Sequence, residues 1–223
     1  MNKEELFEQL KQCVIKGKID VKSPFPPDMK GQNGADELTK EALDAGYQPE
    51  TILNESLVTA MDEVGRMYME KKIFVPQMLI SAKAMSAGMK HLKPYFQSGS
   101  VKLKGTFIVG TVLGDLHDIG KNLVAMIVEG AGYEVIDLGV DVGSEKFKEK
   151  IKEHPEGIVG LSALLTTTMA NMKKIVNEIK EDYPDNKIII GGAPVNEKFR
   201  KEIGADAYAE GPQEAVECLN GLI

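Results

Sequence analysis

The sequence predicts an α/β protein, with an N-terminal four-helix bundle as a cap, followed by a doubly wound, five-stranded parallel sheet. Two observations predict this division. Apolar residues recur at helical spacing up to about residue 97, whereas beyond residue 105 short β-branched runs alternate with helical segments. Such alternation is typical of a parallel sheet covered by helices on both faces. We therefore expect a helical domain over 1–97, a linker over 98–104 and a sheet domain over 105–223.

Four amphipathic segments predict the bundle. One helix is expected over Lys3–Lys16 and a second over Asp36–Ala45. Two more follow from apolar residues that are three or four positions apart and so share one helix face. The third segment carries Leu53, Leu57, Ala60, Met61 and Val64, and the fourth carries Met78, Leu79, Ala82, Met85 and Met89.

The stretch Lys18–Gly34 separates the first two helices. It contains three prolines and two glycines. Proline lacks an amide hydrogen and interrupts helices and central strands, so regular structure is not expected here. We predict an exposed loop.

The second half is predicted to alternate strands with helices. Right-handed crossovers would place the loops after the first, third and fourth strands along one sheet edge, where such folds bind ligands. The predicted strands are Thr106–Thr111, Glu134–Leu138, Gly157–Leu161, Lys187–Ile190 and Ala207–Ala209, and the helices between them are Lys121–Ala131, Ser144–Glu153, Thr168–Asp182 and Asn196–Ile203.

Composition narrows the class of partner. The 27 basic and 34 acidic side chains give a formal net charge of −7, so a polyanion gains no electrostatic attraction and no nucleic-acid partner is expected. Two cysteines, Cys13 and Cys218, indicate neither a disulfide framework nor a cysteine metal cluster. No apolar stretch approaches the length of a bilayer span, and residues 1–10 lack a signal core. We expect a soluble, cytoplasmic protein with no membrane partner.

Three short motifs fall on the loops at the predicted binding edge. They are Asp115-Leu116-His117-Asp118-Ile119-Gly120, Ser162-Ala163-Leu164 and Gly191-Gly192, with 41 residues between the first and second and 26 between the second and third. In order and spacing they resemble the cobalamin-binding module of methionine synthase, cobalamin-dependent mutases and the corrinoid proteins of methyltransfer systems.

The chemistry of the first motif is that of a metal ligand. His117 follows a strand, so its neutral imidazole can project from the sheet and bind a metal, and Asp115 can accept the other ring N–H and fix the tautomer. The resemblance implies that His117 ligates the cobalt of a cobalamin whose own base is displaced, the base-off, His-on state. Asp118 also lies within the motif, but the reading we prefer for it is the N-cap of the next helix.

The resemblance also implies a set of cofactor contacts. Gly120 would lie beneath the flat macrocycle, and Ser162, Gly191 and Gly192 would line a slot for the displaced nucleotide tail. A hydroxyl in the Thr166–Thr168 run would hydrogen-bond Asp115, with Thr168 in the matching position. The other contacts in this predicted set are Asp118, Ile119, Leu164, Thr166, Glu210 and Gly211.

The helical half resembles the cap of methyltransferase corrinoid proteins. Met61-Asp62-Glu63-Val64-Gly65 and Ile73-Phe74-Val75-Pro76-Gln77-Met78-Leu79 match its E-V-G and I-F-x-P-Q signatures. The resemblance implies that the cap shields the upper face of the corrin and swings on a hinge near 97–104. The candidates for its apolar lining are Met61, Val64, Phe74 and Met78.

By resemblance, the function is that of a corrinoid shuttle. Such a protein receives a methyl group from a substrate:corrinoid methyltransferase and delivers it to an acceptor methyltransferase, with a reductive activator as a third partner. A homodimer is a further possibility that the sequence does not decide. The cofactor carries the hard chemistry, so we expect no turnover by the protein alone. Methylamines, methanol, methoxylated aromatics and betaines are all candidate donors.

Three alternative functions compete with the shuttle. A cobalamin-dependent sensor or regulator shares the cap and the cofactor fold, but about 35 Pro-broken residues precede the cap here instead of a DNA-reading helix-turn-helix. The small subunit of an adenosylcobalamin mutase would lack the E-V-G cap. A dinucleotide or P-loop protein would need a G-x-G-x-x-G or Walker-type lysine motif, and the sequence has neither.

Overall fold

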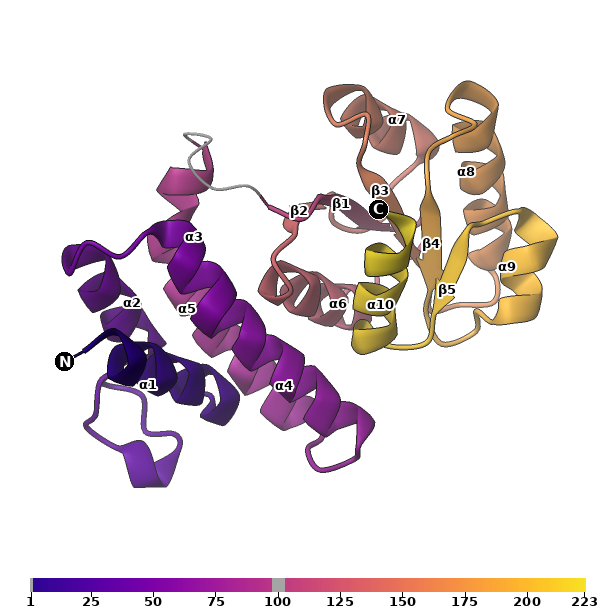
Figure 1. Cartoon of the computed structure of the whole chain (residues 1–223). Coiled ribbons are helices and arrows are strands. Elements are labelled where there is room, and N and C mark those ends of the chain that lie inside the picture. Colours follow the sequence, from indigo (N-terminus) through magenta and orange to yellow (C-terminus); the bar gives the residue numbers. More distant parts are fainter. Residues whose placement is uncertain (1, 98–102) are drawn as a thin grey trace. The chain divides into compact units, whose positions relative to one another are not determined.

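The computed structural model describes residues 2–97 and 103–223. The chain forms two compact units, one of residues 1–103 with 129–132 and the other of residues 104–128 with 133–223. Most of the linker and hinge expected near 97–104 lies outside the described residues, so that expectation stays a prediction. The first unit is helical and the second contains the sheet (Figure 1).

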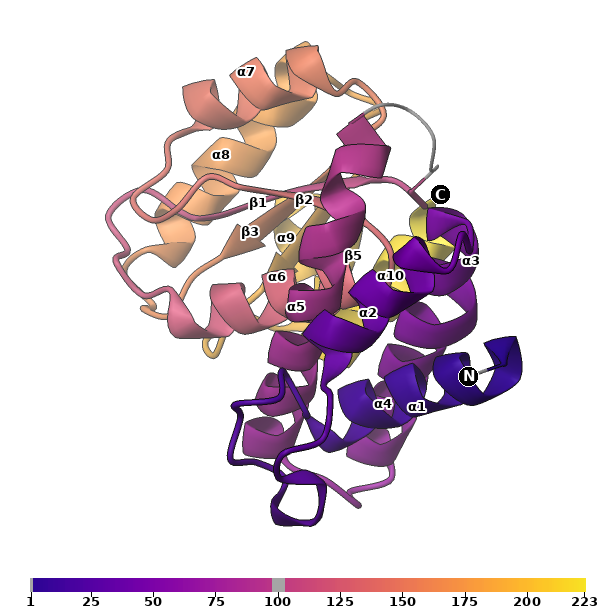
Figure 2. The same cartoon turned by 90° about the vertical axis from the view of Figure 1, so that its left-hand side faces the viewer.

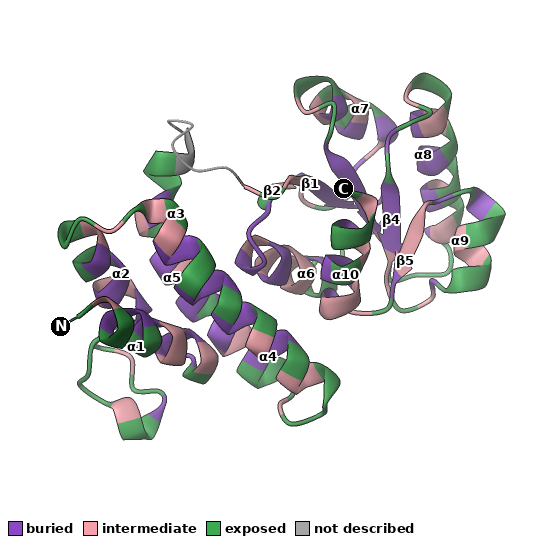
Figure 3. Ribbon diagram, in the orientation of Figure 1, coloured by how far each residue is buried: buried purple, intermediate pink, exposed green. Residues whose placement is uncertain are grey.

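Within its described residues, the helical unit is the expected four-helix arrangement. One of its four long helices is made of three consecutive pieces, of which the middle one is π-helical. Their inward faces are apolar and buried, as at Leu10, Leu57 and Met85 (Figure 3). The helices are α1 (Lys3–Lys16), α2 (Ala35–Asp44), α3 (Pro49–Ile52) continuing through the π-helix η2 (Leu53–Val58) into α4 (Thr59–Met69), and α5 (Val75–Gln97).

The stretch between α1 and α2 is more tightly held than the exposed loop that the sequence predicts. Lys18 is fully buried and its Nζ donates to Ser23 O at 2.8 Å. The amide of Ala35 donates to Lys18 O at 3.0 Å, which fixes the far end of the stretch. Val21 and Phe25 are exposed, as expected, but Pro26 is buried and the short 3₁₀ helix η1 (Pro27–Met29) follows it. The prediction of an exposed, irregular loop was therefore right for much of the middle of the stretch and wrong for its ends, for Pro26 and for η1.

The second unit is a five-stranded parallel sheet of order β2-β1-β3-β4-β5. The first strand pairs on both sides and the order reverses beside it, which confirms the doubly wound fold. Each predicted strand lies within one residue of its observed bounds. The strands are β1 (Thr106–Thr111), β2 (Glu134–Asp137), β3 (Ile158–Ser162), β4 (Ile188–Gly191) and β5 (Ala207–Ala209).

Helices cover both faces of this sheet. Figures 1 and 2 show α6 and α10 on one face and α7, α8 and α9 on the other. Beneath the second group lies a core in which Phe147 of α7 and Met172 of α8 pack with strand residues such as Val159. The covering helices are α6 (Ile119–Gly130), α7 (Ser144–Glu153), α8 (Met169–Asp182), α9 (Glu197–Ile203) and α10 (Pro212–Leu222).

Small residues form a row at the carboxyl ends of the four neighbouring strands. Thr111 of β1 is in register with Ser162 of β3, Ser162 with Gly191 of β4, and Gly191 with Ala209 of β5. The loops that bear all three sequence motifs begin at this row. The fold therefore gathers the motifs at one edge of the sheet.

Candidate functional site

A tight turn connects β1 to the loop that carries His117. The amide of Asp115 donates to Val112 O at 3.0 Å, which closes the turn. Gly114 occupies its third position with φ of 81°, a left-handed conformation that glycine adopts without strain. Thr111 Oγ1 donates to His117 O at 2.8 Å, so the end of the strand also holds the residue that follows the turn.

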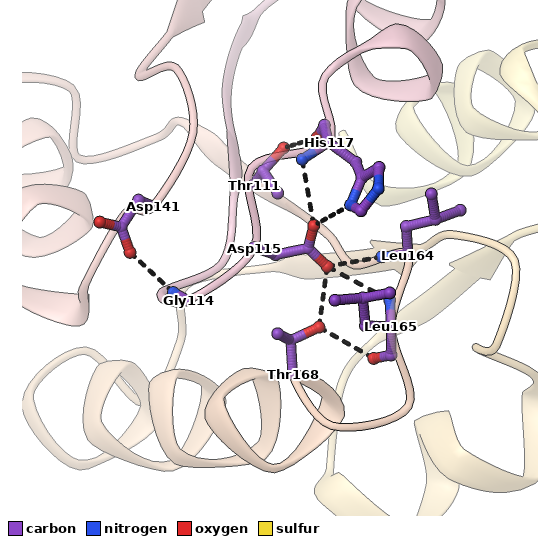
Figure 4. Close-up of polar contacts among 8 residues, drawn as sticks. All are labelled: Thr111, Gly114, Asp115, His117, Asp141, Leu164, Leu165 and Thr168. Carbon is purple, nitrogen blue, oxygen red and sulfur yellow. Dashed lines mark hydrogen bonds and ion pairs between the residues drawn. The ribbon is translucent and has the colours of Figure 1, made fainter.

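Asp115 is fully buried at the centre of this loop, and both of its carboxylate oxygens are occupied (Figure 4). Oδ1 accepts from the amide of His117 at 3.1 Å and lies 2.7 Å from the ring Nδ1. Oδ2 accepts from the Leu164 amide at 2.8 Å, the Leu165 amide at 3.3 Å and Thr168 Oγ1 at 2.8 Å. One carboxylate thus joins the loop after β1 to the loop after β3.

These donors decide the charge of Asp115. Burial raises the pKa of the carboxyl, because a charge is costly away from water. The hydrogen bonds from the Leu164 amide, the His117 ring, Thr168 and the His117 amide outweigh burial and hold the pKa well below its usual range. Asp115 is therefore a carboxylate and accepts every one of these bonds.

His117 presents one ring nitrogen to the protein and the other outward. Its Nδ1 faces the Asp115 carboxylate, so this nitrogen carries the proton and Nε2 is left with a lone pair. Within the described parts of the chain, Nε2 has no hydrogen-bond partner, and 51% of the side chain is exposed. An imidazole in this tautomer, aimed by a carboxylate, is suited to bind a metal through Nε2.

The loop that carries the imidazole and the loop after β3 both expose apolar side chains. A Cβ added to Gly120 would meet no atom within 4 Å, so the space above this glycine is open. Large apolar side chains are exposed on the two loops that meet at Asp115, and a group of exposed apolar side chains is typical of a binding surface. This setting fits a flat, largely apolar group ligated by one imidazole. The exposed side chains are Leu113, Leu116, Ile119, Leu164 and Leu165.

Of the two glycines of the third motif, Gly192 is required by the backbone itself, whereas a side chain at Gly191 would only be crowded. A Cβ on Gly192, which has φ of 118°, would lie 1.8 Å from Ala163 O, and one on Gly191 would lie 3.0 Å from Ala209 O. The sequence assigned these glycines to a slot for a ligand. Close approach of neighbouring chain segments explains Gly192 without any ligand.

The other predicted contact residues divide by burial. Thr168 is buried against Asp115, whereas Thr166 is exposed and makes no such bond. Asp118 directly precedes α6, and its Oδ2 accepts from the Asn122 side chain at 3.0 Å. Ile119 and Glu210 are exposed, and Ser162 and Gly211 are half-buried. In the helical unit Phe74 is exposed, whereas Met61, Val64 and Met78 are buried; their lining role remains a prediction.

Sequence reasoning missed several groups that hold the site. Asn171 Nδ2 donates to Leu113 O at 2.7 Å, and Asp141 Oδ1 accepts from the Gly114 amide at 2.7 Å. The ammonium of Lys121, which is buried, pairs with Asp137 at the end of β2. No motif marks these residues, since each acts across a long sequence separation. The available signal was the strand order: in a doubly wound sheet β2 lies beside β1, so residues that follow β2 are expected near the loop after β1.

Comparison with known proteins decides the family. Residues 105–218 match the family described as "B12 binding domain", and residues 32–93 match a second family with the same description. The chain is 39% identical to dimethylamine corrinoid protein 1 of Methanosarcina acetivorans, over the full length of both proteins. The chain belongs to the corrinoid protein family. It binds a corrinoid, as the motifs predict.

Other corrinoid proteins extend the comparison. The trimethylamine corrinoid protein of Methanosarcina barkeri is 36% identical, over 96% of this chain and 95% of its own. Among solved structures, one chain of the methanol:cobalamin methyltransferase complex of Methanosarcina barkeri matches with a TM-score of 0.82 and 29% identity, over 99% of this chain and 80% of that chain. Within residues 2–97 and 103–223, no helix is both long and apolar enough to cross a bilayer.

Proposed function

We propose that this corrinoid protein carries a methyl group between two methyltransferases on a corrinoid bound base-off, with His117 as the cobalt ligand. The single observation that supports this most is the His117 ring, whose Nδ1 is held by Asp115 and whose Nε2 is left free on a loop that exposes apolar side chains. When bound, the corrinoid supplies the metal on which the methyl group is carried.

The chain's own residues would bind and orient this group. His117 would ligate from the sheet side, and Asp115 would keep the proton on Nδ1 so that Nε2 stays free to coordinate. Leu164, Leu165 and Thr168 would hold Asp115 in its ionised form through their hydrogen bonds. The exposed apolar side chains of the loops after β1 and β3 would contact the corrinoid and exclude water.

The partners in this proposal are a substrate:corrinoid methyltransferase, an acceptor methyltransferase and a reductive activator. A second copy of the chain, in a homodimer, is a further candidate partner. The relatives' names support methylamines as the first donors to test, since two of them are named for dimethylamine and trimethylamine. The same names favour the shuttle over a regulatory function. We place the protein in the cytoplasm, where Cys13 and Cys218 would stay as free thiols.

The test is transfer of a labelled methyl group. The full chain loaded with cobalamin is reduced and mixed with a candidate methyltransferase and trimethylamine, dimethylamine or monomethylamine carrying ¹³C-methyl. We expect one amine to place the label on the protein fraction, and a second methyltransferase to remove it. A protein that binds cobalamin but accepts no label from any amine, methanol, methoxylated aromatic or betaine would contradict the shuttle.

A further inference from the structure

The segment after β2 lies against the turn that carries His117. The amide of Thr111 donates to Gly139 O at 3.0 Å and that of Val142 to Thr111 O at 2.9 Å, so residues 139–142 continue the pairing of β1. Asp137 anchors the near end of this segment, because its Oδ1 accepts from the Gly139 amide at 2.9 Å. Residues 137–142 thus form a support along one side of the turn.

Within this support, Asp141 forms two hydrogen bonds with the turn. Its amide donates to Asp115 O at 3.0 Å, and its Oδ1 accepts from the Gly114 amide at 2.7 Å (Figure 4). The two bonds hold consecutive residues of the turn. Since Asp115 in turn holds the ring of His117, Asp141 lies one residue removed from the proposed ligand.

The backbone of Asp141 has an uncommon conformation. Its φ is 56°, in the left-handed region where most side chains are disfavoured by about 1–2 kcal/mol and where Asp and Asn are the usual exceptions to glycine. This conformation lets the amide and the carboxylate of one residue contact the same turn. Strained positions of this kind persist where the surrounding contacts determine them, and they gather at functional sites.

We propose that Asp141 is a positioning residue for His117, whose carboxylate fixes the Gly114 turn so that the imidazole meets the cobalt in one orientation. The inference rests on the proposed function, in which His117 is the ligand. Asp141 itself is exposed and outside all three motifs, and its side-chain bond goes to the turn and not to the ring. Its effect on the metal must therefore pass through the turn.

Two variants separate the carboxylate from the backbone conformation. Asp141→Gly keeps the left-handed backbone and the amide donor but removes the acceptor for Gly114. Asp141→Asn keeps a side-chain oxygen acceptor and a residue that tolerates this φ. A loss in the glycine variant that the asparagine variant restores therefore reports the side chain of residue 141 and not its amide donor, which both variants keep.

The experiment uses the full chain and cobinamide, a corrinoid without a nucleotide base, so that any axial nitrogen comes from the protein. Cobinamide affinity is measured by absorbance titration, and nitrogen coupling is measured by electron paramagnetic resonance of the reduced Co(II) form. We expect Asp141→Gly to weaken binding by about fivefold to tenfold, the range for one lost hydrogen bond, and to lower the nitrogen-coupled fraction. Asp141→Asn should lie within about twofold of the parent.

A double-mutant cycle with His117→Gln tests whether Asp141 affects cobinamide binding through His117. If Asp141 acts through His117, the glycine substitution has no further effect on cobinamide binding once the imidazole is gone. Urea titration of the cofactor-free variants shows whether each is folded, and binding is compared only below the onset of unfolding. Equal loss in both backgrounds, or nitrogen coupling in Asp141→Gly equal to that of the parent, overturns the inference. Absence of histidine coupling in the parent itself refutes instead the proposed role of His117.

Discussion

At the scale of single residues, Asp115 determines the local structure of the site. It is buried and accepts from three amides, a hydroxyl and an imidazole, in two loops that are about fifty residues apart in the sequence. A neutral side chain of the same size could not accept all of these donors, since an amide group offers one oxygen and two N–H groups. The charge of Asp115 therefore supports the fold as well as His117, the proposed ligand.

The first prediction concerns this charge. Asp115→Asn should lower the free energy of unfolding of the cofactor-free chain by about 2–3 kcal/mol, because it weakens charge-assisted hydrogen bonds and turns an N–H group toward buried donors. Urea denaturation followed by circular dichroism measures the change. Asp118→Asn is the matched control, since Asp118 is exposed and, among its described contacts, its carboxylate bonds only to the Asn122 side chain. A loss as large in the control would refute this account.

The second prediction separates folding from cofactor binding. Gly120 lies in the first turn of α6, and a Cβ there meets nothing within 4 Å. Gly120→Ala should leave the stability of the cofactor-free chain unchanged or raise it by up to about 1 kcal/mol, because alanine favours helix. Cobinamide binding should weaken by at least about tenfold if the macrocycle lies against this position.

Gly143→Ala is the control for that substitution. Gly143 precedes α7, also has open space around its Cβ position, and lies outside the three motifs. It should bind cobinamide as the parent does. Unchanged affinity in Gly120→Ala would show that the corrin does not approach Gly120.

The sequence predicted the pairing of the site residues better than it predicted the groups that hold them in place. The pairing of His117 with Asp115 follows from residue types two positions apart, and both occupy one loop. Asp141 and the Leu165 amide could not be found this way, because their roles depend on a backbone conformation and on a contact between distant loops. Gly192 was assigned to a ligand slot, whereas its own backbone contact with Ala163 already requires glycine.

At the scale of elements, the predicted helices and strands formed close to their expected bounds, whereas the C-terminal helix α10 was not predicted. Residues such as Thr106–Thr111 and Ser144–Glu153 have the predicted bounds, since β-branched runs and helical periodicity report backbone geometry directly. The stretch 18–34 was harder to predict, because Pro and Gly disfavour regular structure but do not indicate which contacts hold the chain. Buried Lys18 and the bond from Cys13 Sγ to Asn33 O fix it against α1.

The third prediction tests how tightly that stretch covers α1. Burial raises the pKa of the Cys13 thiol to about 11. At pH 8 its thiolate fraction is then about a hundredfold below that of an ordinary cysteine, so alkylation should be at least that much slower in the native chain than in urea. The native rate should rise as the pH approaches 11.

Mass spectrometry after iodoacetamide treatment measures this rate. Cys218→Ser is the background, so that the only remaining thiol is that of Cys13. Equal rates in the native and the urea-unfolded chain would mean that the stretch 18–34 does not protect α1.

At the scale of the whole molecule, the sequence motifs are distributed over two structural units. Asp115, His117 and Thr168 all belong to the sheet unit, and the E-V-G signature belongs to the helical one. The sequence predicted this division from the change of periodicity. It could not predict the arrangement of the two halves in the loaded protein, because that depends on the cofactor and the partners.

The fourth prediction follows from this division. A fragment of residues 105–223 should bind cobinamide within about tenfold of the full chain, since every residue proposed to ligate or to hold His117 lies within it. Absorbance titration measures the affinity, and circular dichroism shows whether the fragment is folded. A folded fragment that binds at least a hundredfold more weakly would assign most of the binding energy to the helical half.

The most direct test of the central claim is the identity of the axial nitrogen. The full chain, prepared with ¹⁴N- or ¹⁵N-histidine and loaded with cobinamide, is examined as the Co(II) form by electron paramagnetic resonance. The account predicts a three-line nitrogen splitting that becomes two-line with ¹⁵N-histidine and disappears in His117→Gln. A spectrum without nitrogen splitting, or one that survives the loss of His117, would contradict it.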